Sequence, residues 1–137
     1  MTAFIFEENQ RVTWPVHVNV PDPSSQTGKV MVQTFKIEVD YDKLVSSEIL
    51  DDARQRATAE GVNAFEATEI LTEALRDLAQ DVVTGFSGIQ TGPKKTDPEV
   101  EFSSESFQRL LRRPAVFAAV KTALEQVRNG QAAKTGN

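Results

Sequence analysis

Residues Asn63–Gly88 read NAFEATEILTEALRDLAQDVVTGFSG and form the longest regular pattern in the chain. Apolar side chains recur every three or four residues, as on one face of an α-helix, and polar side chains occupy the other face. Asn63 followed by Glu66 is typical of a helix N-terminal cap. Gly88 suits the left-handed residue that ends a helix. We therefore expect one long helix over 63–88, with an apolar face of Ile70, Leu71, Ala74, Leu75, Leu78, Val82 and Phe86.

Two strands are expected before this helix. Apolar and polar residues alternate from Val12 to Val20, which is the period of a strand with one apolar face. Pro15 lacks an amide donor and therefore predicts a sheet edge or a bulge. A second alternation ends at Tyr41, but Val30–Val32 do not keep its phase, so we expect a bulge or a phase change near Thr34. The turn-forming residues 21–29 between them predict a hairpin.

Three further helices are expected around the central one. The first is capped by Ser46 or Ser47 and runs to about Glu60. The second follows a cap at Ser103, and the third begins at Pro114 and runs to about 128. Residues 89–102 form an irregular loop and 131–137 a flexible tail. The Ala3–Phe6 stretch is apolar enough for a short strand but too short to decide.

The predicted fold class is therefore α+β, with a small N-terminal antiparallel β-hairpin or sheet packed on a bundle of about four α-helices. One domain spans residues 1–130, with strands within about 12–41 and helices within about 46–128. The chain has 137 residues, which suits one domain.

Composition excludes several functional classes. The net charge is −5 and the acidic residues are spread out, which argues against nucleic-acid binding. No apolar run approaches the roughly 20 residues that span a bilayer. The absence of cysteine removes disulfides and thiolate metal sites, and it suits a reducing cytoplasm. A protein partner is the class that these properties favour.

No catalytic, cofactor-binding or metal-binding constellation emerges from the motifs. His17 is the only histidine, and Gly28-Lys29 lacks the rest of a phosphate-binding loop. The sequence from Gly85 to Gly88 is one residue too short for a nucleophile elbow. We therefore expect no enzyme activity, no cofactor and no metal. The aromatic residues could belong to the core or to an interface, because aromatic residues are enriched in both.

Several stretches taken together resemble a known family. They are VTWPVHVNVP at 12–21, QTFKIEVDY at 33–41, DVVTGFSGI at 81–89 and VEFSSESFQRLLRRPAVFAAVKTAL at 100–124. This order is similar to that of the tail assembly chaperones of long-tailed bacteriophages. In that family an aromatic-x-Gly-aliphatic step, here Phe86 to Ile89, precedes a Phe-Ser segment, a proline and a last helix. The sequence departs from the family in having Phe86 where Trp is usual, and Gly92-Pro93 where an Asp-Gly turn is usual.

The resemblance implies a non-enzymatic chaperone in the host bacterial cytoplasm, absent from the mature virion. Such a protein binds the tape measure protein, keeps it soluble and recruits tail tube protein around it; self-association is also compatible. The expected partner-binding groove comprises Phe86, Ile89, Val116, Phe117, Val120 and Leu124. The main alternative is a structural virion protein, such as a tail completion or head–tail connector subunit. A small regulator of a host enzyme is a third possibility.

Overall fold

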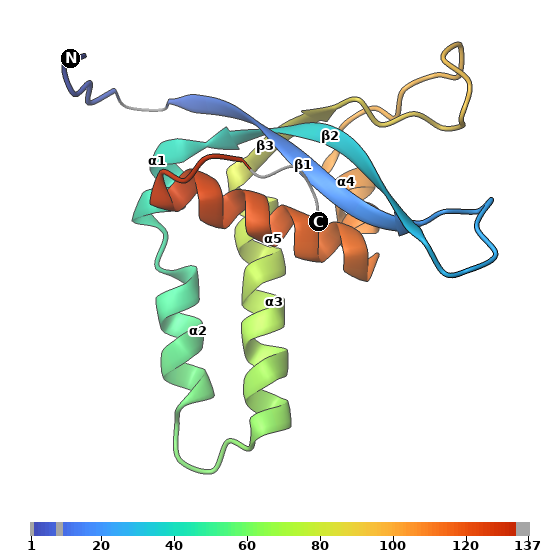
Figure 1. Cartoon of the computed structure of the whole chain (residues 1–137). Coiled ribbons are helices and arrows are strands. Elements are labelled where there is room, and N and C mark those ends of the chain that lie inside the picture. Colours follow the sequence, from blue (N-terminus) through green and yellow to red (C-terminus); the bar gives the residue numbers. More distant parts are fainter. Residues whose placement is uncertain (1, 8–9, 134–137) are drawn as a thin grey trace.

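A three-stranded antiparallel sheet of order β1-β2-β3 forms one layer of the protein, and helices cover one of its faces (Figure 1). The computed structural model describes residues 2–7 and 10–133. The strands are β1 (Arg11–Pro21), β2 (Val30–Asp40) and β3 (Val83–Ser87). The helices are α1 (Tyr41–Ser46), α2 (Ile49–Ala57), α3 (Ala64–Val82), α4 (Ser104–Leu111) and α5 (Pro114–Asn129). The predicted α+β class and antiparallel sheet are confirmed.

The long hairpin of β1 and β2 follows the predicted alternation. β1 lies at the sheet edge, as Pro15 predicts, because an edge position needs no amide donor there. The two strands pair without a break from Arg11↔Asp40 to Pro21↔Val30. The expectation of a bulge or a phase change near Thr34 is therefore wrong, because the pairing keeps one register. Val30 and Val32 break the alternation because they lie on the uncovered face, where both are exposed.

The third strand corrects the prediction of one helix over 63–88. The helix α3 ends at Val82, and Val83–Ser87 pairs with β2. Val82, Val83 and Thr84 are β-branched and favour a strand, and Val83 pairs with Val39. Gly88 does adopt a positive φ, 83°, but it follows a strand rather than a helix.

The connection from the sheet to α2 also differs from the prediction. Tyr41 does not extend the strand but begins α1, which Asp40 caps by accepting a hydrogen bond from the Lys43 amide. The Asp40 carboxylate also binds Arg11, with Nη1 2.9 Å from Oδ2. Glu48 occupies the N-cap position of α2 without a capping bond from its side chain, while the hydroxyl of Ser47 accepts from the Ile49 amide. This helix ends at Ala57 instead of near Glu60.

The last two helices begin where their sequences predict. Ser103 caps α4 through a reciprocal capping box, and the rings of Phe102 and Phe107 pack 6.0 Å apart as a hydrophobic staple. Pro114 is the first residue of α5, and Gly130 ends it with φ of 66°. α5 packs against β1, which places it across the covered face of the sheet (Figure 1).

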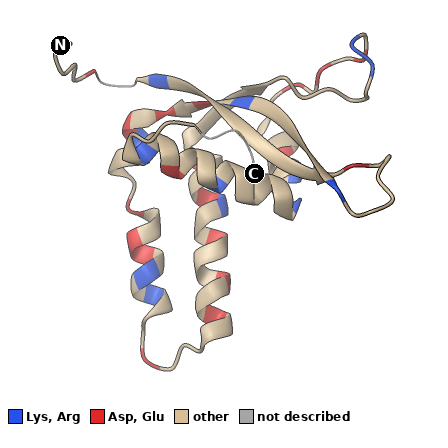
Figure 2. Cartoon of the chain, viewed as in Figure 1, with Lys and Arg blue, Asp and Glu red and all other residues tan. Residues whose placement is uncertain are grey.

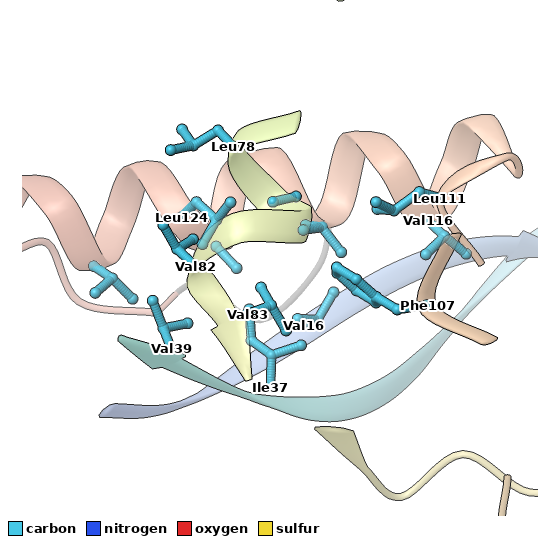
Figure 3. Packing of buried hydrophobic residues seen from close by; sticks show 14 of the residues in the cluster. Val16, Ile37, Val39, Leu78, Val82, Val83, Phe107, Leu111, Val116 and Leu124 are labelled. Atoms are coloured by element: carbon cyan, nitrogen blue, oxygen red, sulfur yellow. The ribbon is translucent and has the colours of Figure 1, made fainter. Parts of the chain in front are cut away.

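The core lies between the covered face of the sheet and helices α3, α4 and α5. Figure 3 shows Ile37 and Val39 of β2 facing Val82 and Val83, with Phe107 nearby. Phe107 and Ile37 are fully buried and are the two largest such side chains in the described part of the chain. Burial of this apolar surface is the main stabilising contribution to the fold.

The loops have their own hydrogen bonds. In the β1–β2 loop, the Ser24 hydroxyl and the Ser24 amide both donate to Asp22 Oδ1. These bonds, the hydroxyl bond most strongly, lower the pKa of the Asp22 carboxyl. Residues 89–102 form an excursion closed by a bridge between Gln90 and Glu99. Of the predicted tail 131–137, residues 131–133 are exposed and without regular structure, and 134–137 lie outside the described residues. The Ala3–Phe6 stretch forms no strand.

Candidate protein-binding groove

A groove of about 260 Å³ lies where the α2–α3 hairpin meets α5, with α1 at one end. Most of its lining is apolar, and every lining residue belongs to a helix. An engineered cavity of about 150 Å³ can hold a benzene ring, so this groove has room for a large apolar side chain. The lining comprises Leu44, Leu50, Arg54, Leu75, Leu78, Ala79, Phe117, Val120, Lys121, Leu124, Glu125, Arg128 and Asn129.

The groove combines a buried floor with partly exposed walls. Leu78, Val120 and Leu124 are buried in the core and form the floor. Leu75 and Phe117 are half-buried, so they retain surface that a partner could cover. The guanidinium carbon of Arg76 lies 5.1 Å from the centroid of the Phe117 ring, a cation–π contact that holds this ring in place.

The charged residues of the groove are mostly basic. Lys121 and Arg128 of α5 lie on one side and Arg54 of α2 on the other, and Glu125 is the one acidic lining residue. Arg54 pairs with Asp51 at 3.1 Å, but both side chains are well exposed and such a pair is weak. No ion pair involves Lys121 or Arg128 in the described part of the chain. The groove mouth is therefore locally positive in a chain whose net charge is −5.

Only three of the six residues predicted from the sequence line the groove. Phe117, Val120 and Leu124 line the groove, whereas Val116 is buried in the core. Phe86 lies away from the groove lining, with its ring 5.2 Å from that of Phe102 and 6.4 Å from that of Phe107. Ile89 is partly buried against the core. The six residues therefore do not form one continuous surface.

Sequence reasoning missed the contribution of the earlier helices. Leu44, Leu50 and Leu75 complete the groove, together with the cation Arg54. Leu75 carries a local signal, because it belongs to the apolar face of α3. Leu50 carries a similar signal, because it belongs to the apolar stripe of α2, but Leu44 carries none. Only the tertiary arrangement of α1 and α2 brings both residues to α5.

The other candidate residues take structural positions. Phe107 is core, whereas Phe65 is 71% exposed at the start of α3. Trp14 is half-buried and donates a hydrogen bond to Gln126. His17 Nδ1 lies 2.9 Å from Thr34 Oγ1 on the uncovered sheet face. Among the described residues, no three His, Asp or Glu side chains gather as a metal site.

A second hollow is polar and of mixed charge. It has a volume of about 310 Å³ and is lined by Glu73, Arg76, Asp77, Gln80, Gln108, Leu111 and Arg112. The Gln80 amide nitrogen is buried without a hydrogen-bond partner in the described chain. Because acidic and basic side chains alternate along this hollow, its charge favours no particular class of ligand.

Comparison with protein-family models, with curated proteins and with solved structures finds no match to this chain. Within residues 2–7 and 10–133, no helix combines the length and the apolar character that crossing a membrane requires. A functional assignment therefore depends on the groove and on the sequence resemblance.

Proposed function

We propose that this protein is a non-enzymatic tail assembly chaperone of a long-tailed bacteriophage. In this proposal it binds the tape measure protein in the host cytoplasm, keeps it soluble and promotes assembly of tail tube protein around it. The observation that carries the proposal is the apolar groove between the α2–α3 hairpin and α5. The resemblance in sequence supplies the identity of the partner.

The groove has properties that suit a chaperone of an apolar helical protein. Partly exposed Leu75 and Phe117 stand beside a buried apolar floor, so an inserted side chain would contact apolar surface on the floor and on the walls. Full burial of one leucine or phenylalanine contributes about 1.5–3 kcal/mol. A few such anchors would hold an aggregation-prone helix without permanent assembly, because binding also costs translational and rotational freedom.

Figure 2 shows acidic and basic residues interspersed along the helices. Nucleic-acid binding depends on clustered cations that neutralise several phosphates. The charge distribution therefore supports a protein partner over a nucleic acid.

Co-expression with the tape measure protein tests the proposal. We expect Phe117→Asp to abolish solubilisation of the tape measure protein, because a carboxylate in the groove wall would lose its hydration when an apolar helix docks. Phe65→Asp is the matched control, since it places the same change on an exposed ring outside the groove. Circular dichroism must show that both variants are folded. Full solubilisation by folded Phe117→Asp would refute the groove as the binding site.

A structural virion protein remains the second candidate because of one observation. β1 presents eleven residues at a free sheet edge, and free edges can pair with another chain. Mass spectrometry of lysate and purified particles separates the two candidates. Abundance in lysate with absence from particles supports the chaperone; a fixed copy number in particles supports the structural subunit.

A further inference from the structure

The groove offers no strand edge to a bound peptide. All its lining residues belong to α1, α2, α3 and α5, and none belongs to a strand. An extended peptide in this groove would lose water from its amides without gaining backbone partners. A helix satisfies its own backbone hydrogen bonds and presents side chains alone. The groove geometry therefore selects a helical occupant.

The groove also selects by charge. Lys121 and Arg128 project from α5 without ion-pair partners in the described chain, and Arg54 stands opposite them on α2. Arg54 is itself paired with Asp51. The positive charge beside the apolar floor therefore lies mainly on α5, where Lys121 and Arg128 outnumber Glu125. A helix with carboxylates beside its apolar stripe would meet these cations as the stripe docks, whereas a basic helix would be repelled.

We propose that the occupant of this groove is an acidic amphipathic helix, with apolar anchors flanked by Asp or Glu. This inference rests on the proposed function and adds the chemistry of the segment that the chaperone selects. Charge contributes mainly to specificity and to the rate of association, while the apolar floor provides most of the affinity. The chain's own exposed Phe4–Phe6 stretch is a weaker candidate, because three apolar residues are too few for a stable helix.

Three synthetic peptides of about 18 residues test the charge selection, a length at which an isolated helix can form. They share one apolar stripe and carry Glu, Gln or Lys at the flanking positions. Fluorescence polarisation measures their affinity for the full chain at low and high salt. We expect the Glu peptide to bind at least about tenfold more tightly than the Lys peptide at low salt, and the difference to shrink at high salt because salt screens exposed charges.

Charge reversal at the groove cations tests their proposed pairing with the carboxylates of the peptide. The double variant Lys121→Glu with Arg128→Glu should reverse the order of the Glu and Lys peptides. The double variant Lys29→Glu with Lys36→Glu is the matched control, because it makes the same change in net charge outside the groove. This control should keep the original order.

The outcomes separate the inference from the proposed function. Equal affinity for all three peptides, lost in Phe117→Asp, would overturn the charge selection and leave the groove as a binding site. A groove already filled by Phe4–Phe6 or by a second copy would block all three peptides until residues 2–7 were deleted or the chain was diluted. That result would also overturn the inference. The proposed chaperone function is tested separately, by co-expression with the tape measure protein.

Discussion

At the scale of single residues, one hydrogen bond joins the edge strand to the last helix. Trp14 Nε1 donates to Gln126 Oε1 over 3.0 Å, and Gln126 is buried. We expect Gln126→Leu to lower the free energy of unfolding by about 1–3 kcal/mol, because it leaves the indole N–H without its acceptor. Urea unfolding monitored by circular dichroism measures this loss.

A double-mutant cycle identifies the cause of that loss. The double variant Trp14→Phe with Gln126→Leu should cost less than the sum of the single variants, by about 0.5–3 kcal/mol, because the second change removes an already unpaired group. Circular dichroism is needed because Trp14 is the only tryptophan, so Trp14→Phe and the double variant have no tryptophan fluorescence. Strict additivity would show that the two side chains contribute independently.

At the scale of elements, β3 contains one glycine and is followed by another with a different backbone conformation. Gly88 has a φ of +83°, whereas Gly85 lies within β3 at ordinary φ. Added Cβ atoms would meet their nearest neighbours at 3.7 and 3.8 Å, so neither site is crowded. We expect Gly88→Ala to cost about 1–2 kcal/mol, the strain of a left-handed residue with a side chain. Gly85→Ala should be neutral or stabilise by up to about 1 kcal/mol, because glycine weakens strands.

Thermal and urea unfolding of the two alanine variants test this difference. Similar losses at both positions would indicate that packing against β2, rather than the sign of φ, determines the cost. A loss confined to Gly88 would show that the positive φ is required where the chain leaves β3.

The boundary between α3 and β3, at Val82 and Val83, shows what the sequence can and cannot reveal. Leu78, Val82 and Phe86 are spaced four apart, so helical periodicity continues through residues that in fact form β3. The competing preference of Val83 and Thr84 for a strand is realised only because β2 lies beside them. The groove likewise depends partly on local pattern and partly on tertiary contacts. The pattern of α5 predicts Phe117, Val120 and Leu124, whereas Leu44 and Leu50 join them only through the tertiary fold.

At the scale of the whole molecule, the α2–α3 hairpin extends away from the layer formed by the sheet and α5 (Figure 1). α2 packs chiefly against α3, and its buried side chains are only the small Ala53 and Ala57. The core residues of α3 lie near its C-terminal end, at Leu78, Ala79 and Val82. One wall of the groove therefore belongs to a part of the molecule with little apolar burial of its own.

Such a hairpin should open without unfolding of the rest of the protein. In hydrogen exchange measured by mass spectrometry, we expect amides of α2 to exchange faster than those of β2 and α5. Ala53→Gly should destabilise α2 by about 1 kcal/mol, because glycine lowers helix propensity, and should speed exchange in the hairpin alone. Phe107→Ala is the contrasting variant: loss of the fully buried ring should cost about 3–5 kcal/mol and speed exchange throughout the core. If Ala53→Gly instead accelerated exchange in β2 and α5 equally, the hairpin and the core would unfold as one unit, and this wall of the groove would be as stable as the core.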